Sequence, residues 1–384
     1  MRTALAALEP LAERDPGSVR IVRAPGRVNL IGEHTDYNGG WVLPAAIDLE
    51  VWIALVPSGD RRVEIQLADG TRAGFDLDGI GGRTGTWIDY VAGTAWSLAG
   101  VGVSTRGFRG VLASTLPVSA GLSSSAAIEL ASAWALTEPP GGGLDRMALA
   151  RVCQRAENEY VGVNCGLMDQ AAESLGRPAA AILLDCRSLE WRPVPLPLDR
   201  FRLVVCDTGS PRRLSASQYN ARRAQCEAAV EELAMSEPSI RSLRDVTPAV
   251  LSAARGRLDP ETYRRCEHVV LENQRVLETV AALEAGDLAA VGRCFAESHA
   301  SLRDLFEVSS PELDAMVAIA TSTPGVIAAR MTGAGFGGSA VAIVERGAEE
   351  ALRGAVLSRY PGMTGLVPGI YPVDVVEGAG PVAE

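Results

Sequence analysis

The order in which strand-like and helix-like segments follow one another most constrains the fold of this chain of 384 residues. Short apolar runs rich in β-branched residues predict strands at 19–22, 42–56, 63–67, 108–116, 180–185, 201–207, 326–331, 340–344 and 370–376. Helical spacing of apolar residues predicts helices at 87–98, 147–160, 214–233, 260–285, 288–305 and 348–357. Because strands and helices occur in both halves without regular alternation, the order favours an α+β fold over a doubly wound parallel sheet.

The length of the chain predicts two domains, because a single apolar core rarely serves this many residues. A proline-rich segment at 193–197 is the candidate boundary. We therefore expect an N-terminal domain of residues 1–195 and a C-terminal domain of residues 196–384, with a cleft between them.

The loop at residues 25–40 carries an unusual density of polar side chains between two predicted strands. It holds an arginine, a glutamate, a histidine, an aspartate and two asparagines among glycines. Loops held between strands often carry chemistry. From these residues alone, a polar hairpin loop, a metal site and a ligand clamp all remain open. A metallohydrolase built on Glu33, His34 and Asp36 would need further ligands at fixed spacing, and the other histidines, His268 and His299, show no such pattern.

A second segment, residues 117–130, follows a predicted strand and contains Ser123, Ser124 and Ser125 where a helix is expected to begin. Backbone N–H groups at a helix N-terminus lack partners within the helix, and the helix dipole also favours an anion there. Small side chains let a phosphate approach closely. The alternative is a well-capped helix, because serine is a preferred N-cap residue.

The chain contains no lysine, so all 36 basic residues are arginines. This excludes a Walker-type phosphate loop and a Schiff-base mechanism, which both need a lysine. Any anion site must use arginine or backbone N–H groups. The glycine-rich segment 332–338 lies between two predicted strands. That context favours a hairpin that brings backbone close to a ligand over a dinucleotide-binding turn, which would open a helix.

Charge and cysteine content limit the partners and the compartment. The formal net charge of −11 argues against nucleic acid or an anionic membrane as the main partner. The seven cysteines are odd in number and form no C-x-x-C pair, which favours a reducing cytoplasm over a disulfide framework or a zinc site. No run approaches the roughly 18 apolar residues of a membrane span, and no secretory signal core is present. We expect a cytoplasmic monomer or weak homodimer that binds neither nucleic acid nor membrane.

Three ordered motifs carry a family resemblance. They are APGRVNLIGEHTDYNGG at residues 24–40, LPVSAGLSSSAA at residues 116–127 and RMTGAGFGG at residues 330–338. Connecting segments such as AENEYVGVNCGLMDQ, LLDCRSLE, RRAQCE, SLRD and ESHASLRDLFEVSSPELD extend the similarity over nearly the whole chain. Together they resemble the galactokinase branch of the GHMP small-molecule kinases, in which the second motif is the phosphate loop.

The resemblance implies a two-domain GHMP kinase fold with the active site in the cleft between the domains. It also implies ATP-dependent phosphorylation of D-galactose at the anomeric hydroxyl, giving galactose 1-phosphate and ADP. Asp169 then corresponds to the catalytic carboxylate, and Arg27 to its partner. Without the resemblance, an aspartate in the first turn of a helix is most often a cap. The expected sugar-binding side chains are Glu33, His34, Asp36, Asp169 and Tyr219.

The resemblance further implies where ATP and Mg²⁺ bind. Trp87 and Tyr90 match positions that line the adenine pocket, although an aromatic pair three residues apart on a helix is otherwise typical of a core. The phosphates are expected on Ser119, Ala120, Gly121, Leu122, Ser123, Ser124 and Ser125. Ser125 and Glu157 correspond to the magnesium ligands, which suits a hard cation that prefers oxygen.

Two other functions remain open at this stage. The first is a kinase of the same fold that acts on another sugar, such as arabinose, galacturonate or N-acetylgalactosamine, because a few pocket contacts decide selectivity. The second is a sensor that binds ATP and galactose without phosphorylating the sugar. Arg27, Ser125 and Asp169 are all present, which favours an active kinase.

Overall fold

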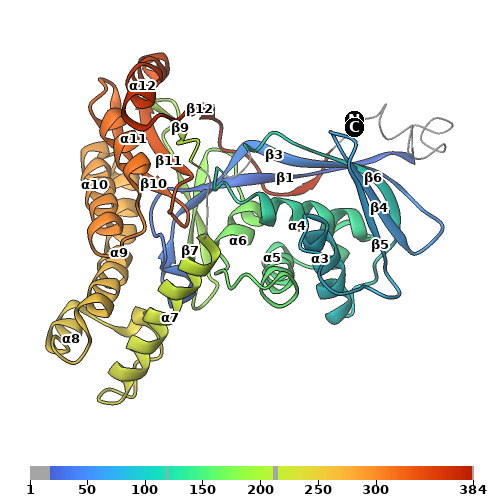
Figure 1. The fold of residues 1–384 in the computed structure, drawn as a ribbon, viewed down its shortest axis with the longest axis horizontal. Coiled ribbons are helices and arrows are strands. Elements are labelled where there is room, and N and C mark those ends of the chain that lie inside the picture. The colour runs from blue at the N-terminus through green and yellow to red at the C-terminus, as the bar shows by residue number, and fades with distance from the viewer. Residues whose placement is uncertain (1–17, 118–119, 211–214, 383–384) are drawn as a thin grey trace.

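The structure is a computed structural model, which describes residues 18–117, 120–210 and 215–382. It contains three sheets with helices packed around them (Figure 1). All strand pairs are antiparallel except that of β4 with β6, and no regular strand–helix alternation occurs. The predicted α+β class is therefore confirmed.

The largest sheet has the order β13-β1-β3-β6-β4-β5. Its strands are β1 (Arg20–Asn29), β3 (Pro44–Pro57), β4 (Arg62–Leu67), β5 (Arg72–Asp76), β6 (Phe108–Ser114) and β13 (Gly380–Pro381). Four helices lie on one side of this sheet: α3 (Ile88–Gly100), α4 (Ser124–Leu136), α5 (Arg146–Arg155) and α6 (Met168–Leu175) (Figure 1). Helices α4 and α6 both contact β1 and β3, so they lie over these two strands.

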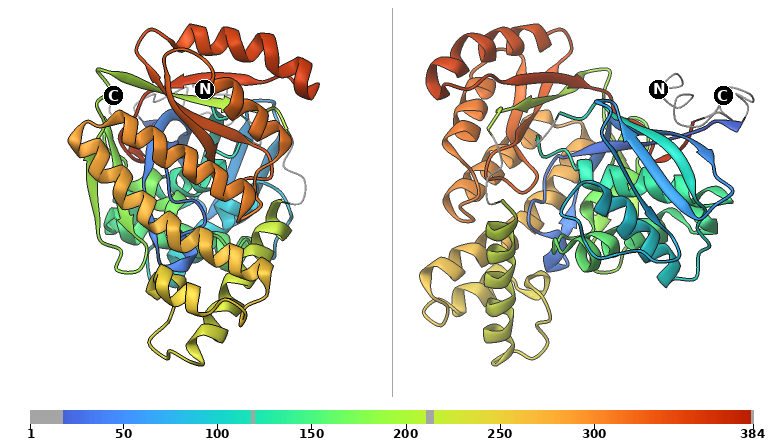
Figure 2. Two further views of the ribbon diagram at one scale, coloured as in Figure 1. Left: turned by 90° about the vertical axis from the view of Figure 1, so that its left-hand side faces the viewer. Right: turned by 45° about the vertical axis from the view of Figure 1, so that its right-hand side comes forward.

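A four-stranded sheet with the order β10-β11-β9-β12 organises the second half. Its strands are β9 (Phe201–Asp207), β10 (Val326–Thr332), β11 (Ser339–Glu345) and β12 (Gly369–Val373). The helices around it are α9 (Pro260–Ala285), α10 (Leu288–Asp304), α11 (Pro311–Thr321) and α12 (Glu349–Thr364). Helices α7 (Ser215–Ala234) and α8 (Pro248–Ala253) project away from this body (Figure 2).

The remaining elements are short. Strands β2 (Trp41–Val42), β7 (Ala180–Asp185) and β8 (Trp191–Pro195) form a third sheet. Single turns of 3₁₀ helix lie at Asp36–Asn38, Pro140–Gly143 and Leu243–Asp245, and a π-helical turn at Ala156–Val161 follows α5. Among the described residues, no helix is long and apolar enough to cross a bilayer.

One apolar core joins the two halves of the chain. The same cluster of buried side chains contains Val28 and Leu112 of the first half and Phe201 and Val341 of the second. In addition, β13 returns to the first sheet, where Gly380 pairs with Arg23 of β1. The boundary between residues 195 and 196 stays a prediction.

The structure differs from the sequence prediction at several elements. Strand β1 does not stop at Val22 but continues to Asn29, so the first residues of the polar loop belong to the sheet. The proline-rich segment at 193–197 is mostly strand β8. The prediction also missed β5, β13, α8 and α11.

Candidate active site

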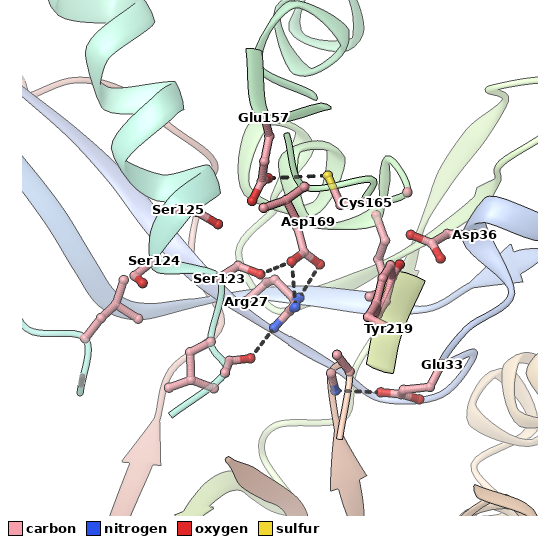
Figure 3. A pocket seen from close by; sticks show the side chains of 18 of the residues that line it. Arg27, Glu33, Asp36, Ser123, Ser124, Ser125, Glu157, Cys165, Asp169 and Tyr219 are labelled. Carbon is pink, nitrogen blue, oxygen red and sulfur yellow. Dashed lines mark hydrogen bonds and ion pairs between the residues drawn. The ribbon is translucent and has the colours of Figure 1, made fainter. Parts of the chain in front are cut away.

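A cavity of about 330 Å³ opens where β1, the N-terminus of α4, the start of α6 and the turn after β10 meet (Figure 3). The segments are far apart in the sequence but converge on this one point. The lining includes most of the predicted site residues: Arg27, Glu33, His34, Asp36, Tyr90, Gly121, Leu122, Ser123, Ser124, Ser125, Glu157, Asp169 and Tyr219.

Arg27 and Asp169 form a two-pronged ion pair at the centre of the cavity (Figure 3). Arg27 Nε donates to Asp169 Oδ1 and Arg27 Nη2 to Asp169 Oδ2, both at 2.7 Å. Arg27 Nη1 donates to the Gly121 carbonyl at 2.8 Å. Burial alone would lower the pKa of Arg27, but the Asp169 carboxylate outweighs it and raises that pKa. Arg27 is therefore charged, and its two hydrogen bonds hold the Asp169 carboxyl group in a fixed position at the cavity.

The serines at the start of α4 do more than cap the helix. Ser123 holds the N-cap position, but its side chain makes no capping hydrogen bond. Its hydroxyl donates instead to Asp169 Oδ2. Ser123 has φ 61°, in the left-handed region that costs energy for any residue except glycine. Ser123, Ser124 and Ser125 all line the cavity, so the first turn of α4, whose N–H groups have no partner within the helix, lies at its wall.

The structure describes only part of the predicted phosphate loop. Gly121 and Leu122 line the cavity, and Ala120 is buried next to them. Ser119 lies outside the described residues. The carbonyls of Gly121 and Leu122 accept hydrogen bonds from the side chain and backbone of Arg27, so this segment is fastened to β1.

Glu157 approaches the cavity from the π-helical turn after α5 and is 6% exposed. Such turns often occur at functional sites because they shift a side chain out of the helical register. Burial and then the charge of Asp169 raise the pKa of Glu157 to about 7. Gln170 Nε2 donates to Glu157 Oε2 at 2.7 Å and to Glu129 Oε2 at 3.0 Å.

The residues around Glu157 fit a divalent cation. Glu129 and Glu173 lie deeper, each 0% exposed, and both oxygens of Glu173 lack a hydrogen-bond partner among the described residues. Burial raises the pKa of both carboxyls well above the usual range, and a cation bound near them would favour their ionised forms. Ser125 and Glu157 both line the cavity, so they offer oxygen ligands toward the same space. Within the described chain, no group of three or more His, Cys, Asp or Glu side chains is arranged to bind a metal.

The predicted sugar-binding residues line the opposite side of the cavity (Figure 3). Glu33 accepts a hydrogen bond from Gly333 N at 3.1 Å and pairs with Arg330. His34 lies between the Tyr37 hydroxyl at 2.9 Å and the Ala334 carbonyl at 3.2 Å, and burial lowers its pKa to about 3, so the ring is neutral.

Asp36 and Tyr219 complete this side. Burial and the charge of Asp169 raise the pKa of Asp36 to about 6. The ring of Tyr219 lies 5.5 Å from that of His34. Because Glu33, His34 and Asp36 turn toward different partners, they do not form the metal triad that the sequence left open.

The two predicted adenine-pocket residues differ in position. Tyr90, on α3, lines the cavity. Trp87 precedes the first turn of α3 and is half-buried against the main apolar core, outside the set of residues that line the cavity. Their role in nucleotide binding stays a prediction.

Sequence reasoning missed part of the lining. Cys165 and Gly166 form the wall beside Asp36, and Gly333 and Ala334 form the wall beside Glu33. The sequence predicts that the glycine-rich turn brings backbone close to a ligand, but it does not indicate the sugar side of the cavity. Cys165 carried no signal, because an unpaired cysteine has no local pattern.

The N-terminus of α4 is strained, lined by serines and next to the Arg27–Asp169 pair, and this site lies between the two halves of an α+β fold. Fold and site together define a small-molecule kinase of the GHMP class. Family models agree: "GHMP kinases N terminal domain" matches residues 89–177, and "GHMP kinases C terminal" matches residues 279–362. The "Galactokinase galactose-binding signature" matches residues 12–57. The chain belongs to the galactokinase family.

Individual relatives support this placement. The chain is 45% identical to a galactokinase of Roseiflexus sp. (strain RS-1), over 95% of this chain and 93% of the relative. It is 42% identical to a galactokinase of Chloroflexus aggregans, over 99% of this chain and 97% of the relative. The crystal structure of Lactococcus lactis galactokinase complexed with galactose superposes with a TM-score of 0.93 at 35% identity and covers 98% of this chain and 99% of that one. Methanococcus jannaschii mevalonate kinase shares the fold alone, with a TM-score of 0.68 at 18% identity.

Proposed function

We propose that this protein transfers the γ-phosphoryl group of ATP to the anomeric hydroxyl of D-galactose, giving galactose 1-phosphate and ADP. The observation that carries the proposal is the position of Asp169. Its carboxylate is held by Arg27 between the N-terminus of α4 on one side and Glu33, His34, Asp36 and Tyr219 on the other. A sugar hydroxyl and a phosphate bound on these two sides would meet at Asp169.

In this proposal the nucleotide is held largely by backbone. The N–H groups that open α4, together with Gly121, Ser123 and Ser124, would bind the phosphates at the positive end of the helix. This explains how a chain without lysine uses ATP. Tyr90 and Trp87 would contact the adenine from α3.

Mg²⁺ is the cofactor that the acidic surroundings favour. Ser125 and Glu157 would hold it, and a bound cation would keep Glu157 ionised at neutral pH, where burial otherwise makes the carboxyl easy to protonate. When bound, the metal would neutralise negative charge on the phosphates. Gln170, which donates to Glu157 at 2.7 Å, would keep that carboxylate in place.

Galactose would be selected by hydrogen-bond acceptors. Carboxylates such as Glu33 and Asp36 accept from sugar hydroxyls, and their fixed positions favour one epimer because a misplaced hydroxyl leaves a buried polar group unpaired. Neutral His34 would contact the sugar through its ring, because Tyr37 and Ala334 already bind its two nitrogens. The aromatic ring of Tyr219 closes the site beside it.

Asp169 would act on the sugar hydroxyl directly. Both Asp169 oxygens accept a hydrogen bond from Arg27, and one of them also accepts from Ser123, so the carboxylate cannot rotate away from the sugar hydroxyl. The sugar hydroxyl would donate its hydrogen bond, and then its proton, to an Asp169 oxygen, while the hydroxyl oxygen bonds to the γ-phosphorus of ATP and the bond from that phosphorus to the ADP oxygen breaks. Arg27 would stabilise negative charge on the transferring group.

A substrate panel tests the proposal. The enzyme is incubated with ATP, Mg²⁺ and a series of aldoses that includes galactose, arabinose, galacturonate and N-acetylgalactosamine, and phosphorus NMR identifies the phosphorylated carbon. We expect the highest kcat/KM with galactose and a phosphate on C1. A higher kcat/KM with another sugar, or ATP and galactose binding without ADP formation, would overturn it.

We further propose that the enzyme works in the cytoplasm as a monomer or weak homodimer. All seven cysteines are unpaired, which suits a reducing compartment. Light scattering after size-exclusion chromatography measures the oligomeric state, and a stable assembly larger than a dimer would refute that part.

A further inference from the structure

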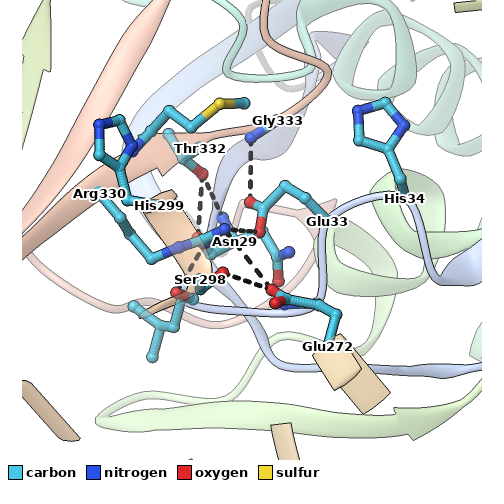
Figure 4. Close-up of polar contacts among 12 residues, drawn as sticks. Asn29, Glu33, His34, Glu272, Ser298, His299, Arg330, Thr332 and Gly333 are labelled. Atoms are coloured by element: carbon cyan, nitrogen blue, oxygen red, sulfur yellow. Dashed lines mark hydrogen bonds and ion pairs between the residues drawn. The ribbon is translucent and has the colours of Figure 1, made fainter. Parts of the chain in front are cut away.

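A buried network of ion pairs lies behind the sugar side of the cavity (Figure 4). Its centre is Arg330, on β10, which is 0% exposed. It joins three segments that are distant in the sequence: the loop after β1, helix α9 and the end of β10. The proposed sugar contact Glu33, 1% exposed, belongs to this network and also lines the cavity.

Arg330 contacts Glu33 directly. One Arg330 Nη2 atom forms an ion pair with Glu33 Oε2 and lies 3.7 Å from Glu272 Oε1. Arg330 Nη1 donates to the Leu30 carbonyl at 2.9 Å. The other Glu33 oxygen accepts from Gly333 N at 3.1 Å. Groups from the second half of the chain therefore contact both Glu33 oxygens, Gly333 through a hydrogen bond and Arg330 through the charge of the ion pair, since Glu33 Oε2 has no hydrogen-bond partner among the described residues.

Glu272 also pairs with Arg330, and both of its carboxylate oxygens accept further hydrogen bonds. It accepts hydrogen bonds from Ser298 Oγ at 2.6 Å, from Gly32 N at 3.1 Å and from Arg275 Nε at 2.8 Å. Two glutamates thus face two arginines, Arg330 and Arg275, in a region without solvent. Arg275 contacts Glu272 but is not among the partners of Glu33 in the described structure.

The charge of Arg330 matters because the Glu33 side chain is almost wholly buried, at 1% exposed, and a buried negative charge needs a partner. Burial raises the pKa of Glu33, and Arg330 and the Gly333 N–H act against this. Without Arg330, the carboxyl would take up a proton, and an acceptor facing the sugar would become a donor. A carboxylate has roughly four lone-pair sites, so those not used by Arg330 and Gly333 remain for the sugar.

We propose that Arg330, held by Glu272, is a positioning residue that fixes Glu33 as a hydrogen-bond acceptor for the sugar. Sugar affinity would then depend on a contact between β10 and the loop after β1, and not on the loop sequence alone. The inference rests on the proposed function, since it concerns how the galactose side of the same site is held.

A purely structural role makes a different prediction, and Arg275 separates the two. Arg330 and Arg275 are both buried and both pair with Glu272, but only Arg330 contacts Glu33. The variants Arg330→Lys and Arg275→Lys each keep the charge and lose the planar fork. If the network served stability alone, both would destabilise the protein and change the two substrate constants alike.

The experiment measures KM for galactose and for ATP in wild type, Arg330→Lys, Arg275→Lys, Glu33→Gln and the Glu33→Gln/Arg330→Lys double variant. We expect Arg330→Lys to raise the galactose KM by about tenfold, because lysine lacks the planar fork that reaches Glu33 and the Leu30 carbonyl at the same time, and to leave the ATP KM within about twofold. Arg275→Lys should leave both constants within about twofold. In the Glu33→Gln background, Arg330→Lys should have no further effect on the galactose KM, because its partner is already lost.

Two results would overturn the inference. One is that Arg330→Lys and Arg275→Lys raise the galactose KM equally. The other is that the double variant raises the galactose KM by the product of the factors measured for Arg330→Lys and Glu33→Gln alone. Absence of galactose turnover by the wild type would instead refute the proposed function. If Arg330→Lys does not fold, Ser298→Ala carries the test, since it removes only the hydrogen bond to Glu272. If Ser298→Ala raises the galactose KM by about threefold and leaves the ATP KM unchanged, the inference is supported. If Ser298→Ala leaves the galactose KM unchanged, the inference is overturned.

Discussion

Replacing Asp169 by asparagine removes the charge on which the proposed chemistry depends and keeps the shape of the side chain. The carboxylate accepts from Arg27 Nε and Nη2, both at 2.7 Å. Asparagine offers one acceptor oxygen, and its NH₂ group would face an N–H of Arg27. The variant therefore loses one strong hydrogen bond, the ion pair and the group that takes the proton.

The size of the effect follows from burial and chemistry. Breaking a fully buried ion pair by removing one partner costs about 3–5 kcal/mol. The Arg27 side chain is 5% exposed and that of Asp169 is 26% exposed, so water compensates part of the loss. We expect a decrease of about 2–3 kcal/mol in the free energy of unfolding. Loss of a general base lowers kcat by about 10²–10⁴.

Three measurements check this prediction. Coupled release of ADP gives kcat, isothermal titration calorimetry gives galactose affinity, and urea unfolding gives stability. The matched control is Asp78→Asn, which removes the same chemical group from an exposed pair with Arg61, where Asp78 is 72% exposed. The control should change stability by about 0.5 kcal/mol at most and leave kcat unaltered.

The reasoning fails if Asp169→Asn binds galactose and retains a kcat within about tenfold of the wild type, because a proton acceptor cannot be dispensable to that degree. A variant that is destabilised as expected but loses galactose binding entirely would assign Asp169 to substrate binding instead.

Three further changes probe the two sides of the cavity. A Cβ at Gly166 would lie 1.8 Å from Asp36 Oδ2, so Gly166→Ala should raise the galactose KM by about tenfold or more and leave the ATP KM unchanged, as steady-state kinetics would show. Because the pKa of Asp36 is raised to about 6, the galactose KM should rise as the pH falls below that value, and Asp36→Asn should flatten the profile. The same shift means that the contribution of Asp36 to stability is present below its unfolded value of 3.8 and is lost as the pH rises through about 6, which urea unfolding at several pH values measures. Gln170→Met removes the 2.7 Å hydrogen bond to Glu157 and should raise the half-saturating Mg²⁺ concentration by about tenfold without changing the galactose KM, measured by titrating Mg²⁺.

Most residues of the predicted polar cluster lie in short segments that can be recognised in the sequence. Arg27 belongs to the first motif, Ser125 to the second and Asp169 to a connecting segment, and the structure brings all three to one cavity. Their partners were harder to find. Glu272 and Arg330 are separated from Glu33 by hundreds of residues, and a buried charge that is paired across such a distance leaves no local pattern.

Missed secondary structure has physical reasons. Pro25 and Gly26 usually end a strand, but β1 passes them through an irregularity in its pairing with β3, where a Cβ on Gly26 would lie 2.7 Å from the Leu122 carbonyl. Strand β8 tolerates its prolines because it is at the edge of its sheet. The start of helix α11 does show a helix-start pattern in the sequence, because Ser310 caps the helix and a proline follows in its first turn.

The pairing of β13 with β1 has a consequence for biosynthesis. Arg23 pairs with Gly380, so β1, the strand that carries Arg27, keeps one open edge on the ribosome until the residues of β13 have been translated. During that interval the unpaired edge is a site for wrong strand pairing between nascent chains. The first half of the enzyme is made early, but its sheet is completed only after Gly380 and Pro381 have emerged.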